Sequence, residues 1–279
     1  MKISIFLINF AVFLVLACWN SALAEESEKL RLISISPGTT EILYSLGLGD
    51  NILAVSSSCN YPEAALSKPR IGSFSNANIE MILHLRPDIV FATGLEQAES
   101  VKTLRSLGVK VIVSHPKNMQ ELFDSIRKIG RATARPKEAE ILVRDMQNKL
   151  KGAAENRKNI KRPSVFVEIW SDPLMTVGRN SFVAELISLA GGENIAYDAP
   201  RPYSRFNPEI VIRRNPDFII LSYMTNNNAK EKIKTRLGWR YISAIKNDNI
   251  IADISPDLLL RPGPRTVEAV EKLSKIFNK

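Results

Sequence analysis

The chain contains the same short motif twice, 129 positions apart. Residues 78–90 and 207–219 share an asparagine, a glutamate two positions later, and a Pro-Asp pair followed by apolar residues. In each copy the asparagine suits the N-cap of a short helix, and the glutamate suits its first turn, where the helix dipole favours an acid. The Pro-Asp pair ends the helix, and the apolar run after it is typical of a buried strand. One helix–turn–strand unit used twice predicts two similar lobes.

A second pair of similar segments supports this duplication. Residues 41–52 and 185–195 each begin with a glutamate, continue as an apolar helix that ends at Gly47 or Gly191, and then enter a polar turn. These segments are 143 to 144 positions apart, so the lobes should differ in loop length. Chance similarity between ordinary helix–strand units is the alternative, and two matches in the same order favour duplication.

The N-terminal segment has the composition of a secretory signal peptide. A basic start at Lys2 precedes an apolar run over residues 3–17, and Ala22-Leu23-Ala24 has the small-residue pattern of a cleavage site. The apolar run is too short for a comfortable transmembrane helix. We therefore expect residues 1–24 to be a signal peptide.

Cys18 offers an alternative form of export. Residues 15–18 can be interpreted as a lipoprotein box, with Cys18 lipidated after cleavage in front of it. Leu16 is bulky for such a box, so cleavage after Ala24 is favoured. In both cases the sequence predicts an exported protein that does not span the membrane. If Cys18 is removed, Cys59 is the only cysteine and the exported chain has no internal disulfide, which a chain with a sizeable core does not need.

The chain is basic, with a formal net charge of +9. A charge of this sign can indicate a nucleic-acid-binding protein. The export signal argues against that class, and the lysines and arginines are dispersed among acids. A solvated surface, or one that faces anionic lipid headgroups, explains the charge instead.

Strands alternate with helices along most of the chain, which indicates an α/β fold with mostly parallel sheets flanked by helices. In the first half, residues 32–36, 52–55 and 109–113 have the apolar, β-branched composition of strands. About 255 residues remain after the signal peptide, which is enough for one large or two medium domains.

The pattern changes between residues 136 and 160, where apolar residues recur at helical spacing with no strand between them. Roughly 24 residues at 1.5 Å each give a helix about 36 Å long. Such a helix would join the lobes rigidly. We therefore expect an N-terminal lobe over residues 25–135, an interlobe helix over residues 136–160 and a C-terminal lobe over residues 161–279.

Several short motifs in this order resemble one protein family. They are Ser36-Pro37 followed by Thr40-Glu41, Tyr61-Pro62, Gly72-Ser73-Phe74 before the first repeat, the Pro-Asp turns before strands, and residues 261–265. The chain resembles the periplasmic substrate-binding proteins of ABC importers that have a helical backbone between two lobes. Members carry cobalamin, haem or iron–siderophore complexes, and the chain is most similar to the cobalamin-binding receptors.

The resemblance implies a receptor that captures cobalamin or a related corrinoid between the lobes, with haem or an iron–siderophore complex as the alternative. Such a receptor needs no cofactor of its own and is expected to be a monomer. By the resemblance, the cleft would be lined by the aromatic residues Tyr61, Phe74 and Tyr203 and by the polar residues Asp257 and Arg261, with Pro37 and Trp170 nearby. Thr93 departs from the pattern, since a tryptophan would line the cleft there, and Phe74 replaces another. Ordinary core packing is the alternative for each aromatic.

The resemblance also gives the repeated glutamates a role. In such receptors an acid on each lobe docks against arginines of the membrane permease, which works with an ATPase. Glu80 and Glu209 match these acids, and charge complementarity of this kind fixes the orientation of a complex. The alternative is that both glutamates merely stabilise a helix N-terminus.

Catalysis has little support in the sequence. The two histidines, His84 and His115, lie far apart, and there is no nucleophile elbow, metal-binding histidine pair or phosphate loop. A serine cluster before Cys59 lacks a nearby base, so an exported hydrolase is the less favoured alternative. A receptor for bare zinc or manganese would need more histidines. We expect His84, on the same helical face as Glu80, to lie at the surface.

Overall fold

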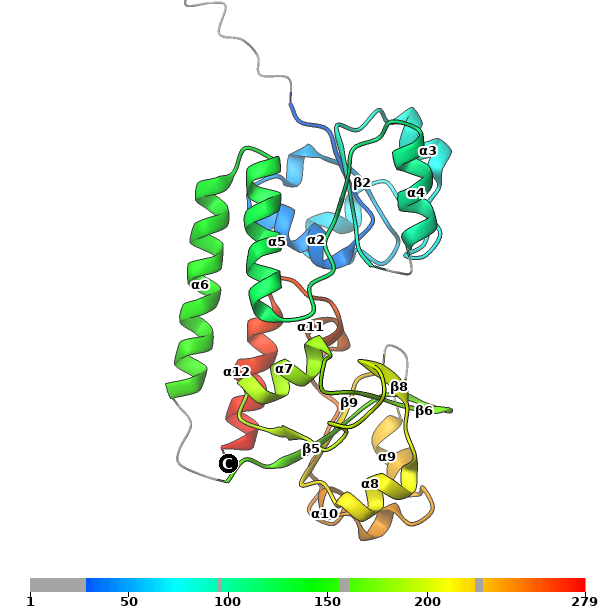
Figure 1. Cartoon of the computed structure of the whole chain (residues 1–279), viewed down its shortest axis with the longest axis vertical. Coiled ribbons are helices and arrows are strands. Elements are labelled where there is room, and N and C mark those ends of the chain that lie inside the picture. Colours follow the sequence, from blue (N-terminus) through cyan, green and yellow to red (C-terminus); the bar gives the residue numbers. More distant parts are fainter. Residues whose placement is uncertain (1–28, 95–96, 156–160, 224–227, 279) are drawn as a thin grey trace, which may run out of the picture.

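The N-terminal lobe is built on a four-stranded, fully parallel sheet in the order β2-β1-β3-β4 (Figure 1). The computed structural model describes residues 29–94, 97–155, 161–223 and 228–278. Every residue of the central strand β3 is buried, as expected for a strand covered by helices on both faces. The elements of this lobe are β1 (Leu32–Ser34), α2 (Pro37–Ser45), η1 (Gly49–Asn51), β2 (Ile52–Val55), η2 (Glu63–Ser67), α3 (Ile79–His84), β3 (Ile89–Ala92), α4 (Ala98–Ser106), β4 (Val111–Val113) and α5 (Met119–Ala132).

The C-terminal lobe holds a six-stranded mixed sheet. Strands β10, β9 and β5 are parallel, whereas β6 and β8 extend the sheet as antiparallel strands, and the short β7 pairs with β5. The antiparallel part follows from the two residues between β5 and β6, because so short a connection can join only antiparallel strands. The strands are β5 (Ser164–Ser171), β6 (Leu174–Val177), β7 (Glu193–Asn194), β8 (Tyr203–Arg205), β9 (Phe218–Leu221) and β10 (Ile250–Ile251). The helices are α7 (Phe182–Leu189), α8 (Pro208–Arg214), α9 (Ala229–Lys234), η4 (Trp239–Tyr241), α10 (Ser243–Lys246), α11 (Pro256–Leu260) and α12 (Thr266–Phe277).

The two copies of the motif fold alike. Asn78 and Asn207 are the N-caps of α3 and α8, and each side chain accepts a hydrogen bond from a backbone N–H of the first turn, at 2.9 Å and 2.8 Å respectively. The helices begin where the sequence predicts, because the asparagine oxygen satisfies a donor that has no partner within the helix.

The aspartates of the two copies also have one structural role. The Asp88 carboxylate accepts a hydrogen bond from the backbone N–H of Arg31 at 2.7 Å, directly before β1. The Asp217 carboxylate accepts one from the backbone N–H of Ser164 at 2.8 Å, where β5 begins. Each aspartate thus fixes the start of the first strand of its own lobe.

The lobes are joined by α6 (Pro136–Glu155), which packs against α5 and α12 (Figure 1). The predicted interlobe helix continued to residue 160, and residues 156–160 lie outside the described part of the chain. One cluster of buried apolar side chains includes Leu43 of the N-terminal lobe, Met146 of α6 and Leu273 of the C-terminal lobe. The interlobe helix is therefore one of three packed helices over a shared core, and not an isolated rod.

The predicted signal peptide also lies outside the described residues. Within the described ranges, none of the helices has both the length and the apolar character required to cross a membrane.

Candidate functional site

A cavity of about 330 Å³ lies between the two lobes. Most of its exposed surface is apolar, and polar side chains are spread around it. The apolar side chains are Pro37, Phe74, Pro116, Phe182, Leu260 and Pro262. The polar side chains are Ser36, Thr39, Ser58, Thr93, Ser114, His115, Tyr203 and Arg261. A cleft with a mainly apolar surface and spread polar groups suits a ligand with apolar faces that hydrogen bonds orient.

Matching parts of the two lobes build this cleft. The N-terminal ends of α2 and α7, the first helix of each lobe, both reach it. The dipeptides His115-Pro116 and Arg261-Pro262, which precede the last helix of each lobe, also line it. The internal duplication therefore places an imidazole on one side and a guanidinium on the other.

Gly38 lets the lobes approach closely at the cleft. A Cβ atom on Gly38 would overlap the carbonyl oxygen of Pro262, so a side chain at this position cannot be accommodated without a shift of the backbone. The N-terminal turn of α2 thus lies directly against the segment before α12. This contact sets the distance between the lobes on one side of the cleft.

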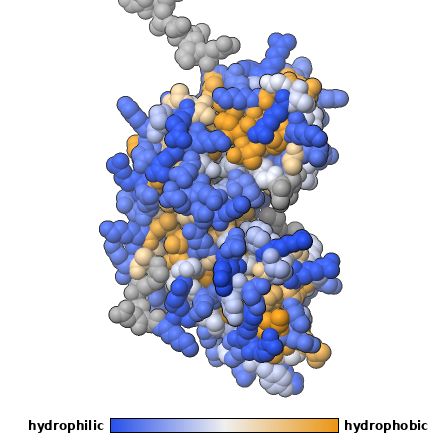
Figure 2. Space-filling model, in the orientation of Figure 1, coloured by the Kyte–Doolittle hydropathy of each residue, from blue (hydrophilic) through white to orange (hydrophobic). Residues whose placement is uncertain are grey.

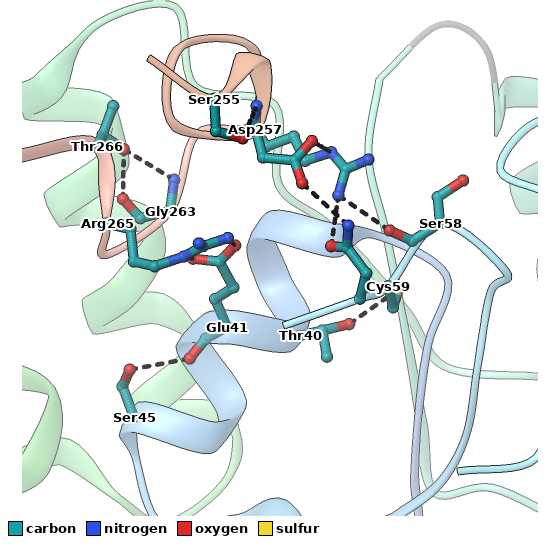
Figure 3. A network of polar contacts seen from close by, with 12 residues as sticks. Thr40, Glu41, Ser45, Ser58, Cys59, Ser255, Asp257, Gly263, Arg265 and Thr266 are labelled. Carbon is teal, nitrogen blue, oxygen red and sulfur yellow. Dashed lines mark hydrogen bonds and ion pairs between the residues drawn. The ribbon is translucent and has the colours of Figure 1, made fainter. Parts of the chain in front are cut away.

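Arg261 is held by a network that joins the lobes, and its partners Ser58 and Asp257 are labelled in Figure 3. Its Nε lies 3.0 Å from the Asp257 carboxylate, and its Nη1 donates to the Ser58 carbonyl at 3.0 Å and to Asn60 Oδ1 at 2.8 Å. Asn60 in turn donates to Asp257 at 3.0 Å. The guanidinium charge is therefore paired before any ligand enters, and its position is fixed from both lobes.

A second interlobe contact lies beside this network (Figure 3). Arg265 donates from Nε and Nη2 to the two carboxylate oxygens of Glu41, at 3.0 Å and 2.6 Å. The guanidinium also lies over the Tyr61 ring, 3.6 Å from its centroid. Burial raises the pKa of Glu41, although Arg265 acts in the opposite direction. Bidentate pairs of this kind hold both partners in one geometry.

Four of the seven predicted binding residues line the cleft, namely Pro37, Phe74, Tyr203 and Arg261. Asp257 does not line it and instead holds Arg261. Tyr61 and Trp170 do not line it either. One face of Tyr61 is covered by Arg265, and Trp170 is 55% exposed at the end of β5, where its indole N–H donates to the Asp172 carbonyl at 2.7 Å. The part each residue plays in binding stays a prediction.

His115 is a cleft residue to which the sequence reasoning gave no role. The sequence does contain a feature that could have identified it, because the His-Pro dipeptide and the Arg-Pro dipeptide occupy matching positions before the last helix of each lobe. Thr93, noted for its departure from the family pattern, also lines the cleft. His84 is exposed on α3, as expected.

Glu80 and Glu209 lie away from the cleft. Both are exposed, in the first turns of α3 and α8. Figure 1 shows these helices at opposite ends of the molecule, one on each lobe.

Cys59, which follows the serine cluster, is not an activated nucleophile. The Cys59 thiol is buried, and Thr40 donates to its sulfur at 3.1 Å. Burial raises the pKa of this thiol, which keeps it protonated and unreactive. Across the described residues, no group of three or more histidine, cysteine or acidic side chains is arranged to hold a metal ion.

Comparisons with known proteins agree on one family. The model for periplasmic binding proteins matches residues 32–256. The ABC transporter substrate-binding lipoprotein YvrC of Bacillus subtilis is 32% identical over 265 residues, which cover 92% of this chain and 82% of that protein. The vitamin B12-binding protein of Vibrio cholerae is 32% identical over 256 residues, which cover 91% of each.

Solved structures share the two-lobed fold. The periplasmic vitamin B12 binding protein BtuF of Vibrio cholerae superposes with a TM-score of 0.78 at 30% identity, covering 88% of this chain and 96% of that one. The periplasmic heme-binding protein RhuT of Roseiflexus sp. RS-1 superposes with a TM-score of 0.78 at 27% identity, covering 90% and 98% respectively.

Proposed function

The chain belongs to the periplasmic binding protein family and is a substrate-binding protein of an ABC transporter, and we propose that it captures a corrinoid, cobalamin or a close relative, between its lobes. Relatives named as vitamin B12-binding proteins at 32% identity support this ligand class.

The charge balance of the cleft is the observation that carries the proposal. Apart from His115, Arg261 is the one ionisable cation among the described residues that line the cleft, and Asp257 already pairs its charge. A corrin ring is large and flat and carries neutral amides around its edge, so it needs apolar walls and a few hydrogen-bond donors. Haem carries two carboxylates, and burying both of them inside the cleft itself, where no described cation is unpaired, is costly.

Haem is the second candidate, and His115 is the observation that favours it. An imidazole exposed in the cleft can bind the iron of a haem through a ring nitrogen. One of the similar solved structures, 27% identical to this chain, is named as a heme-binding protein.

Titration monitored by absorbance separates these ligands, because both are coloured. We expect the purified protein to bind cyanocobalamin with higher affinity than haemin. Replacing Phe74 or Tyr203 with alanine should weaken binding by about 1 kcal/mol or more, since each loses apolar contact with the ligand. Tyr241→Ala removes an exposed ring outside the cleft and serves as the control. Tight haemin binding without corrinoid binding would reject the proposal in favour of haem.

Delivery to a permease completes the proposed function. Glu80 and Glu209, exposed at opposite ends of the molecule, are suited to contact one half of a two-fold permease each. Residues 1–24 would direct export to the periplasm, and lipidation of Cys18 is the alternative that a lipoprotein relative supports.

A further inference from the structure

A second cavity opens beside the cleft, at the carboxyl ends of β3 and β4. It has a volume of about 450 Å³ and shares Thr93 and His115 with the cleft. We call it the side groove. The carboxyl ends of parallel strands are where α/β sheets bind ligands, because loops and helix N-termini converge there.

Small residues at the junction join the side groove to the cleft. A Cβ atom on Gly94 would overlap the His115 ring, so the imidazole lies against the bare backbone of Gly94. Thr93 is held by a hydrogen bond from its hydroxyl to the Ser114 carbonyl, at 2.8 Å. The cleft and the side groove therefore meet at Thr93 and His115, whose side chains line both cavities.

The walls of the side groove are apolar and its edge is basic. Ala98, Val101 and Val113 supply the apolar part. Figure 2 shows apolar residues gathered on this lobe beside α4. The edge carries Lys102 and Arg105, which are three positions apart on α4 and so share one face of it.

The basic edge has little opposing charge in the described part of the chain. Arg105 lines the groove and donates to the Val111 carbonyl at 3.3 Å, a contact that leaves the guanidinium charge unneutralised. Glu99 is the acid on α4, and it does not line the groove.

We propose that the side groove receives an anionic arm of the ligand whose main body lies in the cleft. The inference rests on the proposed function and extends it to a specific chemistry. In cobalamin the anionic arm is the phosphodiester of the nucleotide loop. Lys102 and Arg105 pair with the phosphate, while the apolar walls contact the attached sugar and base.

Cobinamide provides the test, because it keeps the corrin ring and lacks the phosphodiester loop. We expect the wild-type protein to bind cyanocobalamin more tightly than dicyanocobinamide. Lys102→Glu with Arg105→Glu should lower the affinity for cyanocobalamin at least about threefold and leave that for cobinamide unchanged. Lys102→Glu alone should lower the affinity for cyanocobalamin by a smaller factor and also leave that for cobinamide unchanged. The preference for cyanocobalamin should shrink as the salt concentration rises.

Lys110→Glu is the matched control, since Lys110 is an exposed lysine of the same lobe that does not line the side groove. It should leave both affinities unchanged. An equal loss for both corrinoids, or no loss in a folded double variant, would overturn the inference. If neither corrinoid binds, the proposed ligand class is wrong. The affinities of the same variants for haemin and for its dimethyl ester, which lacks free carboxylates, then test whether the side groove binds carboxylates.

Discussion

Glu41 and Glu185 occupy matching positions in the two lobes, and each carboxylate binds the start of the last helix of the opposite lobe. Glu41, on α2, pairs with Arg265 at the N-cap of α12, at 2.6 Å. Glu185, on α7, accepts a hydrogen bond from the backbone N–H of Met119, the first residue of α5, at 2.7 Å. The two lobes are therefore tied reciprocally.

The pair of Glu41 and Arg265 should contribute substantially to stability. Glu41→Ala leaves a largely buried guanidinium without its carboxylate, and we expect it to lower the free energy of unfolding by about 2 kcal/mol or more. The double variant Glu41→Ala with Arg265→Ala should lose less unfolding free energy than the sum of the losses in the two single variants. Urea unfolding of the four proteins measures this.

Arg127 and Glu140 form the control pair, with a similar N–O distance of 2.9 Å at a more exposed site. Their coupling should be clearly weaker than that of Glu41 and Arg265, because solvent screens an exposed pair. Equal coupling for the two pairs would contradict the importance of burial.

Glu185 should make stability depend on pH. Burial raises the pKa of this carboxyl above its ordinary value of 4.5, although the Met119 N–H opposes the change. The folded protein therefore binds the proton more tightly than the unfolded chain does, so the contribution of this group falls as the pH rises from about 4.5 through the pKa of the folded state. Glu185→Gln keeps an acceptor oxygen and removes the titration. Relative to wild type, this variant should become more stable as the pH rises. If the difference in unfolding free energy between the two proteins does not vary with pH, Glu185 does not make stability depend on pH.

Gly38→Ala should disturb the cleft and the fold together. The added methyl group overlaps the Pro262 carbonyl, and we expect a loss of about 1–3 kcal/mol in unfolding free energy with weaker ligand binding. Gly152→Ala is the control, because no atom lies near its Cβ position and the residue is within α6. This change should stabilise the protein by up to about 1 kcal/mol. Wild-type stability and binding in Gly38→Ala would show that the close approach is not required.

The lobes should move little when ligand binds. α5, α6 and α12 pack over one apolar core, and closure would require that core to shear. Small-angle scattering profiles with and without ligand should nearly coincide, whereas closure by tens of degrees would refute the rigid connection.

Glu80→Lys with Glu209→Lys should reduce uptake and spare ligand binding. In the proposed docking, both reversed charges would face arginines of the permease and repel them. Ligand titration of the isolated receptor should match wild type, and each single alanine variant should be milder. Glu63→Lys reverses an exposed acid outside both repeats and serves as the control. Normal uptake by the double variant would return both residues to the role of stabilising a helix N-terminus.

Local signals predicted much of the fold. Asn78 and Asn207 act on backbone groups within a few residues, so their helices could be located from sequence alone. The Pro-Asp turns located β3 and β9 in the same way. The antiparallel strands β6 and β8 were not predicted, because neither follows a Pro-Asp turn and neither is a run of apolar β-branched residues.

The cleft was less predictable, since its contacts join residues far apart in the chain. Tyr61 has the exposed loop context of a ligand contact, and nothing near it shows that Arg265 covers one face. Asp257 appears from the family pattern to be a polar contact of the ligand, yet its carboxylate is committed to Arg261 and Asn60. Which side chains remain available to a ligand can be assigned only when the packing of both lobes is known.

The reciprocal bonds of Glu41 and Glu185 have the form of a subunit interface. A single lobe that paired with a copy of itself about a two-fold axis would make one such contact twice, with identical partners. Once the two copies are fused in one chain, each contact can change without the other. In this protein one carboxylate holds a guanidinium and the other holds a backbone amide, so the two related contacts differ in chemistry and mutation can tune them separately.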